Sequence, residues 1–206
     1  MESFGKLLFT PAVQAEQDKV GMRDRYAQTY ETRFTGPLDD NTRAFIQTRQ
    51  SFYMASVSSH DWPYIQHRGG PAGFVKILGE EQIGFADYAG NKQFITRGNL
   101  ETQTKVSLFF MDYPRKARLK LLGRARMVDA IDDPKLAARL FQDGAAPAER
   151  LVVIDVAAVD WNCPKYIEPR YSESEIAAMI GPRLAALQEE NELLRKQLAA
   201  FEANQA

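Results

Sequence analysis

The chain has 206 residues with a formal net charge of −1, and 45% of its residues are hydrophobic. This composition excludes a disordered chain, and the balanced charge argues against a protein built mainly to hold nucleic acid. The single cysteine, Cys163, excludes an internal disulfide framework and a cysteine-based metal site, and no metal is expected. No N-terminal apolar run of the signal-peptide type appears, and no apolar run reaches the roughly 18 residues of a membrane helix. We therefore expect a cytoplasmic protein without membrane contact.

The N-terminal region is predicted to be helical. Helix formers dominate residues 12–33, with Gly21 as the weak point. Residues 39–41, Asp-Asp-Asn, offer caps for a second short helix that turns residues 44–46, Ala-Phe-Ile, toward a core. Residues 1–44 are therefore predicted to form an N-terminal helical extension.

The middle of the chain has the composition of short strands separated by turns. Little helix lies between these segments, which favours an antiparallel barrel of six or seven strands over alternating βαβ units. Two short helices are also predicted, over residues 92–100 and 132–141. The predicted strands are residues 52–58, 62–66, 74–78, 82–86, 106–111, 118–128 and 151–159.

The segment from Pro182 onward has the spacing of a coiled-coil seam, with intervals of 3-4-3-4-3. A helix of about three heptads is marginal alone and needs a partner surface. Pairing within a homodimer is the preferred interpretation, and a helix laid on its own domain is the alternative. Residues 171–206 are predicted to form this C-terminal helical tail. The seam residues are Leu184, Leu187, Asn191, Leu194, Leu198 and Phe201.

Two glycine-bearing turns with cations are predicted within residues 61–99, at residues 67–70 (His-Arg-Gly-Gly) and residues 88–92 (Tyr-Ala-Gly-Asn-Lys). Small residues beside cations suit a close backbone approach to an anion, so a phosphate-bearing cofactor is the first hypothesis. A helix beginning at residues 90–92 would present its N–H groups to the phosphate. A glycine turn with a surface arginine is the alternative for the first turn.

The order of these features is an HRGG turn, FVKIL and FADY strands, a GNKQ segment and a long basic strand. It resembles the pyridoxamine 5'-phosphate oxidase-like, FMN-binding split-barrel family over residues 45–170. The resemblance implies a mainly β fold with flanking helices, built on a six-stranded antiparallel split barrel. It also implies a homodimer with FMN bound non-covalently between the subunits, and an FMN-dependent oxidoreductase acting on a small organic substrate.

The resemblance also implies which residues contact the cofactor. Arg68 and Lys76 match positions at the flavin. The segment from residue 85 to residue 93 matches the phosphate site with Lys92 as its one cation, and Arg68 or Arg118 is a candidate to complete the charge. Trp161 and Arg170 resemble a pair that the partner subunit places against the flavin. The cofactor-binding candidates are His67, Arg68, Gly69, Lys76, Asp87, Tyr88, Asn91, Lys92, Gln93, Arg118, Trp161 and Arg170.

Individual residues leave alternatives open. His67 is the candidate general acid, since its ordinary pKa lies near neutrality, or a structural histidine. Asp87 is a base, an acceptor for the ribityl hydroxyls, or a strand-end cap. Gln66, Gln93 and Asn99 are candidate donors to the ring edge. Cys163 is a nucleophile or part of a fixed turn.

The chain departs from the oxidase in lacking its C-terminal Arg-x-His motif, because both histidines, His60 and His67, lie elsewhere. Vitamin B6 phosphate is therefore not the expected substrate. The alternatives to the leading function are a true pyridoxamine 5'-phosphate oxidase and an NAD(P)H-dependent flavin, quinone or nitro reductase. A non-catalytic protein that binds flavin, haem or deazaflavin is the third alternative.

Overall fold

The structure is a computed structural model that describes residues 1–33, 35–142, 147–161 and 164–204. Contacts divide the chain into two compact units. The first comprises Met1–Asp112 and Ala117–Lys165, and the second comprises Tyr113–Lys116 and Tyr166–Ala206. The predicted domain limits at residues 44/45 and 170/171 stay a prediction.

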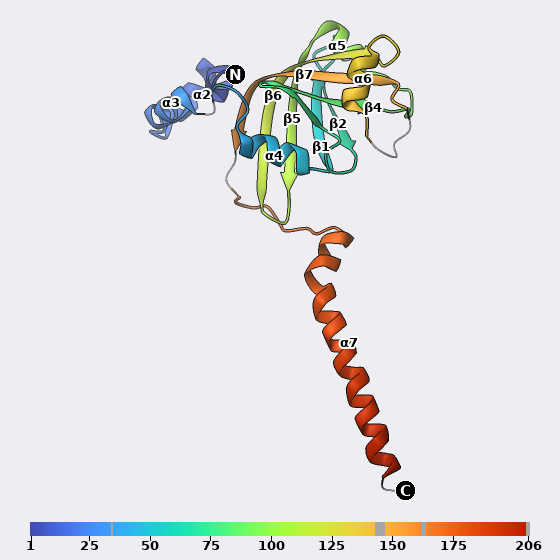
Figure 1. Cartoon of the computed structure of the whole chain (residues 1–206). Helices are drawn as coiled ribbons and strands as arrows, with labels where there is room; N and C mark the ends of the chain where they lie inside the picture. Colours follow the sequence, from blue (N-terminus) through green and yellow to red (C-terminus); the bar gives the residue numbers. More distant parts are fainter. Residues whose placement is uncertain (34, 143–146, 162–163, 205–206) are drawn as a thin grey trace. The chain divides into compact units, whose positions relative to one another are not determined.

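The strands of the first unit form one antiparallel sheet in the order β2-β1-β5-β6-β7-β4-β3 (Figure 1). The prediction of an antiparallel sheet with flanking helices is confirmed. The described residues form seven strands where the family resemblance implied six, because a four-residue strand, β3, pairs with β4 at one edge. The strands are β1 (Ser51–Val57), β2 (Pro63–Gly69), β3 (Lys76–Gly79), β4 (Gln82–Asp87), β5 (Lys105–Asp112), β6 (Ala117–Asp129) and β7 (Arg150–Trp161).

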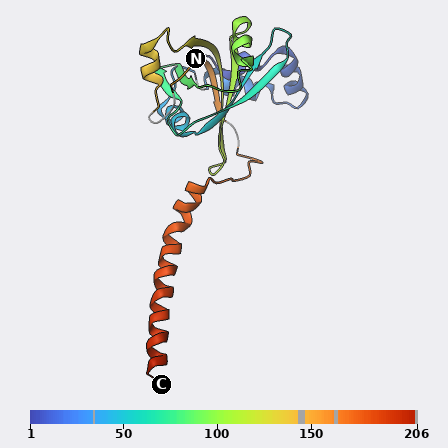
Figure 2. The same cartoon turned by 90° about the vertical axis from the view of Figure 1, so that its right-hand side faces the viewer.

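The sheet curls, so that strands from distant places in its order face one another (Figure 2). β2 and β4 are not hydrogen-bonded neighbours, yet Arg68 Nη1 of β2 lies 2.6 Å from Asp87 Oδ1 of β4. Phe52 fills the interior, with ring centroids 5.3 Å from Phe85 and 4.8 Å from Phe110. Burial of each such side chain stabilises the fold by about 1.5–3 kcal/mol.

The described helices flank this sheet or lie in the terminal segments. The predicted helix over residues 12–33 is two helices, because the chain turns at Gly21 with a φ of 66° that glycine adopts without strain. The Tyr30 hydroxyl at the end of the second donates a 3.0 Å hydrogen bond to Asp160 of β7, which ties the N-terminal helices to the sheet. The helices are α1 (Phe4–Leu8), α2 (Pro11–Lys19), α3 (Arg23–Thr32), α4 (Asp40–Thr48), α5 (Ile95–Thr102), α6 (Pro134–Leu140) and α7 (Glu173–Ala203).

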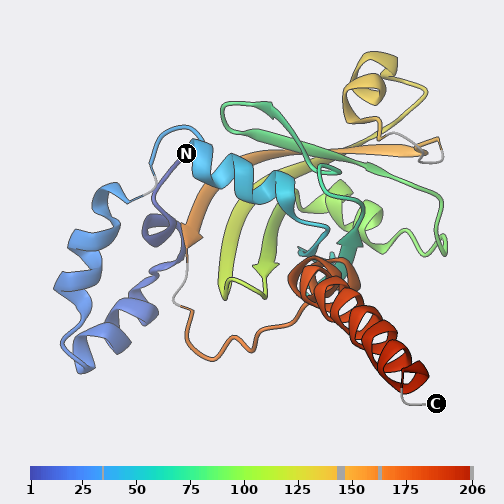
Figure 3. The same cartoon turned by 60° about the horizontal axis from the view of Figure 1, so that its bottom comes forward.

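Helix α4 lies alongside the strands (Figure 3), and its sequence explains its orientation. Asp39 caps it by accepting a hydrogen bond from the Thr42 N–H at 2.7 Å. Phe45 and Ile46 are buried as predicted, but Ala44 is exposed. The prediction for Ala44 is wrong because successive helical residues point about 100° apart, so three in a row do not share the narrow buried face.

Two local predictions near the glycine segments are also wrong. Residues 67–69 are not a turn, because β2 continues through them in register with β1, Tyr53 opposite His67 and Ser51 opposite Gly69. The chain leaves the strand only at Gly70, where a Cβ would lie 2.7 Å from a Phe74 ring carbon. Residues 90–92 do not start a helix, since α5 begins at Ile95.

In the second unit, α7 begins with a capping box. The Ser172 hydroxyl accepts a hydrogen bond from the Glu175 N–H, and the Glu175 carboxylate accepts one from the Ser172 N–H. Among the residues the structure describes, every helix is too short or too polar to span a lipid bilayer. The same residues contain no group of three His, Cys, Asp or Glu side chains placed to hold a metal ion.

Candidate functional site

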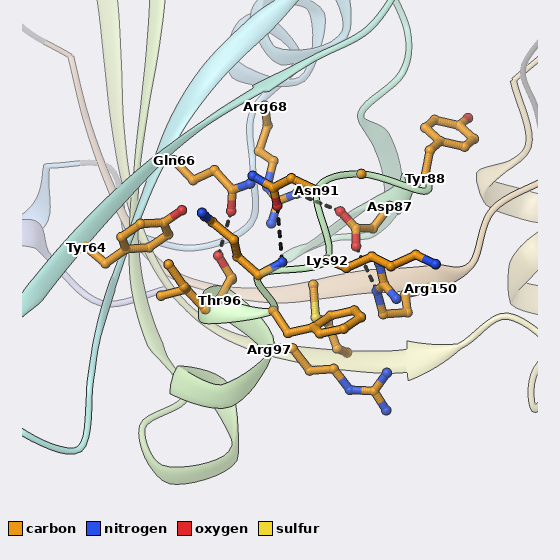
Figure 4. Close-up of a pocket in the computed structure, with 15 residues that line it drawn as sticks. Tyr64, Gln66, Arg68, Asp87, Tyr88, Asn91, Lys92, Thr96, Arg97 and Arg150 are labelled. Atoms are coloured by element: carbon orange, nitrogen blue, oxygen red, sulfur yellow. Dashed lines mark hydrogen bonds and ion pairs between the residues drawn. The ribbon is translucent and has the colours of Figure 1, made fainter.

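A cavity of about 210 Å³ lies where the end of β4, the loop after it and the start of α5 face β2 (Figure 4). β6 and β7 each add one residue to its wall. The lining residues are Tyr64, Gln66, Arg68, Asp87, Tyr88, Gly90, Asn91, Lys92, Gln93, Phe94, Ile95, Thr96, Arg97, Met127 and Arg150.

Strand β2 supplies one side of the cavity through alternate residues. Side chains two apart on a strand share a face, which is why Tyr64, Gln66 and Arg68 all line it. The Thr96 hydroxyl of α5 donates a 2.8 Å hydrogen bond to Gln66 Oε1. This bond fixes the start of α5 against β2, so the two walls are held at a set spacing.

A buried carboxylate between two guanidinium groups forms the floor of the site. Asp87 is 9% exposed, and its oxygens lie 2.6 Å from Arg68 Nη1 and 2.9 Å from Arg150 Nε. Figure 4 shows the two arginines reaching Asp87 from different strands. Burial acts to lower the pKa of Arg150, but the hydrogen bond and charge of Asp87, followed by those of Glu149, raise it overall. Arg150 therefore stays charged.

The charges on the wall do not balance. Four cations line the cavity against one carboxylate, Asp87. Two of the cations also have carboxylate partners outside the cavity: Arg97 pairs with Asp129 at 2.9 and 3.1 Å, and Arg150 Nη1 lies 2.9 Å from Glu149. With these partners counted, one positive charge remains in excess, which favours an anionic ligand. The four cations are Arg68, Lys92, Arg97 and Arg150.

The loop between β4 and α5 has an unusual backbone. Lys92 and Phe94 have φ angles of 58° and 53°, a left-handed conformation that residues with a side chain rarely adopt. Contacts hold it there: the Gln93 N–H donates to Asn91 Oδ1 at 3.2 Å, and the Arg150 guanidinium lies 5.2 Å from the Phe94 ring centroid. Such strained segments cluster at ligand sites.

A second cavity of about 160 Å³ adjoins the first and shares Arg68, Asp87 and Tyr88 with it. Burial raises the pKa of the Tyr88 phenol, so its hydroxyl keeps its proton at neutral pH. Each cavity is smaller than the roughly 300–1,000 Å³ of ordinary ligand pockets. A ligand of cofactor size therefore extends beyond either one.

The structure brings eight of the twelve cofactor candidates to these cavities. His67 and Gly69 line only the second one. His67 is exposed, and its ring centroid lies 5.6 Å from that of Tyr53, because it points to the opposite face of β2 from Arg68. The six in the first cavity are Arg68, Asp87, Tyr88, Asn91, Lys92 and Gln93.

Two predicted cations lie elsewhere in the first unit. Lys76 Nζ donates to Gln142 at 3.3 Å and lines neither cavity. The Arg118 guanidinium lies 5.7 Å from the Phe109 ring centroid on β5, and its Nε is buried without a partner among the described residues. Neither residue adds charge to the site within one chain.

Neither member of the predicted aromatic and arginine pair is among the residues that line the two cavities of the first unit. Trp161 packs on Phe45 with ring centroids 4.7 Å apart, and its Nε1 donates to Thr42 at 3.3 Å. The Arg170 guanidinium belongs to the second unit, where it lies 5.1 Å from the Tyr113 ring centroid. Cys163 lies outside the described residues.

Sequence reasoning missed Arg150, which holds Asp87 from the other side. It directly precedes the predicted strand over residues 151–159, and antiparallel pairing of β4 with β7 places it opposite Asp87. Pairing the two strands in advance would have shown this match of opposite charges. Thr96 and Arg97 were not named because the helix was predicted to begin at residue 92, whereas α5 begins at Ile95.

A family model described as pyridoxamine 5'-phosphate oxidase matches residues 38–163, which is more than half of the chain. No curated protein matched. The solved structures similar to the chain include HupZ of Group A Streptococcus, with 14% identity, 65% of this chain and 99% of that one covered, and a TM-score of 0.48. An FMN-binding protein of Syntrophomonas wolfei has 13% identity, coverage of 72% and 95%, and a TM-score of 0.43. The chain belongs to the pyridoxamine 5'-phosphate oxidase family and has its FMN-binding split-barrel fold.

Proposed function

We propose that the protein is an FMN-dependent oxidoreductase that acts on a small organic substrate. The observation that carries the proposal is the electropositive cavity, with four cations against one carboxylate, in a family whose members commonly bind FMN. A phosphate monoester carries nearly two negative charges near neutral pH and binds to Arg, Lys and N–H donors. The donors of this cavity fit that group.

The lining residues divide by chemistry. Lys92 supplies charge for the phosphate from the loop. Asn91 adds an amide, and Arg97 of α5, which is paired with Asp129, adds a guanidinium. Thr96 and Gln66 offer a hydroxyl and an amide of the kind that ribityl hydroxyls pair with. FMN, when bound, supplies the electron-transfer chemistry, and the protein positions and tunes it.

The protein's own residues keep the site in shape. Asp87 has both oxygens engaged by guanidinium groups, so it positions Arg68 and Arg150 instead of acting as a free base. Tyr88 keeps its proton because burial raises its pKa, and it can donate a hydrogen bond at neutral pH. No step in this account requires His67 as an acid.

A homodimer would complete the site. The cavities of one chain are small, and the neighbouring β1–β2 hairpin carries exposed apolar side chains, with Trp62 76% and Ile65 65% exposed. Apolar surface of this kind favours contact with another protein surface. A second copy placed there would supply the missing wall.

The test is the absorption spectrum of the purified protein, before and after FMN is added. We expect flavin bands and saturable uptake, with quenching of free-FMN fluorescence. Bleaching on anaerobic NADPH addition would identify a nicotinamide-driven reductase, and peroxide release from pyridoxamine 5'-phosphate would identify the oxidase proper. Colourless protein that takes up no FMN would refute the proposal.

A further inference from the structure

Helix α7 carries an apolar seam that no other described residue of the second unit covers. It is one continuous helix from Glu173 to Ala203 (Figures 1 and 3). Five apolar seam residues are between 46% and 61% exposed, which is a large unfavourable surface for a single helix. These residues are Leu184, Leu187, Leu194, Leu198 and Phe201.

We infer that α7 pairs with α7 of a second copy of this chain as a parallel, in-register coiled coil over residues 184–201. The inference does not depend on FMN binding. It fixes the direction and the register of the pair, which a seam alone leaves open.

The polar residue in the seam selects the parallel direction. Leu184, Asn191 and Leu198 occupy position a of the heptad, and Leu187 and Leu194 occupy position d. In a parallel pair a faces a, so the two Asn191 amides meet and hydrogen-bond. In an antiparallel pair a faces d, and each Asn191 amide would be buried against leucine, which is costly.

Charge complementarity selects the same direction. Glu190 occupies position g and Arg195 the following position e. Five residues apart on one helix, they point about 140° apart and cannot pair with each other within it. In a parallel pair, position g faces position e of the next heptad in the other copy, so Glu190 meets Arg195 twice by symmetry.

An antiparallel pair loses both matches. There g faces g and e faces e, so Glu190 would meet Gln197 of the second copy, and Arg195 would meet Gln188. Neither charge would then face an opposite charge across the pair. Asn191 in the seam and the charges of Glu190 and Arg195 beside it therefore both favour the parallel pair.

Disulfide trapping in the full chain tests the direction. In a Cys163→Ser background, Leu198→Cys is expected to form an intermolecular disulfide on mild oxidation, because position a faces itself. In an antiparallel pair the two thiols would be roughly 16 Å apart, beyond disulfide reach. Lys196→Cys, at the outward position f, is the control and should remain monomeric on a non-reducing gel.

Charge reversal tests the register. Arg195→Glu should lower the yield of the Leu198→Cys disulfide in a glutathione redox buffer about tenfold, by replacing two attractions with two repulsions. Adding Glu190→Arg should restore it, while Glu189→Arg at position f should not. Absence of the Leu198→Cys disulfide, or a disulfide only between mixed Leu187→Cys and Leu198→Cys chains, would overturn the inference. FMN uptake by the same samples reports separately on the proposed function.

Discussion

The barrel and helix α7 differ in how far their apolar side chains are covered by the chain itself. In the barrel, large apolar side chains such as Phe52 and Leu108 are buried within the chain, and the one buried carboxylate of the site has two partners. In α7, the apolar seam is exposed, and Glu190 and Arg195 beside it point too far apart to pair with each other. The barrel buries its own core, whereas a single helix such as α7 is marginal alone and, in the pairing inferred above, would gain its stabilisation from association.

The largest expected loss of stability comes from replacing Asp87 in the barrel. Asp87→Ala leaves Arg68 without its carboxylate partner and Arg150 with Glu149 alone, and should cost about 3–5 kcal/mol of unfolding free energy. Asp129→Ala is the control, since its pair with Arg97 is about 40% exposed and contributes under about 1 kcal/mol. Urea unfolding measures both, and equal losses would contradict the account.

Truncating one leucine in each region compares the barrel with α7 directly. Leu108→Ala opens a cavity in the core and should cost about 2–5 kcal/mol. Leu198→Ala should leave the barrel transition unchanged and weaken only the association of α7. Both tryptophans, Trp62 and Trp161, lie in the first unit, so their fluorescence follows barrel unfolding alone. A shifted fluorescence midpoint in Leu198→Ala would show that α7 stabilises the barrel.

A lysine exchange tests the electropositive wall without disturbing the core. Lys92→Gln should weaken FMN binding about tenfold, because one charge-assisted contact to the phosphate is lost. Lys116→Gln is a matched control, since Lys116 is also exposed and also left-handed, with a φ of 52°. Fluorescence titration with FMN compares them, and equal affinities would remove Lys92 from the site.

The smallest effect concerns the link between the N-terminal helices and the barrel. Burial, followed by the charge and hydrogen bond of Asp160, raises the pKa of Tyr30 to about 12. Between its ordinary pKa and this value the unfolded chain loses the proton and the folded chain keeps it, so stability falls as pH rises through that window. Wild type should lose more stability than Tyr30→Phe between pH of about 9 and 11. Equal losses by chemical denaturation would mean that the bond is absent.

Local sequence patterns predicted the strands well, but features that depend on contacts between distant residues or on unusual backbone conformations were missed. The composition of short segments between turns predicted all seven strands, and glycine and cation spacing pointed to residues 88–92. The family resemblance added Asp87 and Gln93. Arg150 was missed because its role depends on strand pairing across the sheet. The start of α5 was misplaced because Lys92 and Phe94 adopt left-handed conformations that their residue types do not signal.

The position of β7 between β6 and β4 has a consequence for synthesis of the chain. Asp87 and Arg150 are 63 positions apart, so the ribosome makes the carboxylate well before its second guanidinium partner. At roughly 5–20 residues per second, that interval is about 3–13 s. During this time β4 has no β7 to pair with, and the nascent chain holds an open sheet edge. Pairing of Asp87 with Arg150 in the candidate site and closure of that sheet edge are thus one event during synthesis of the chain.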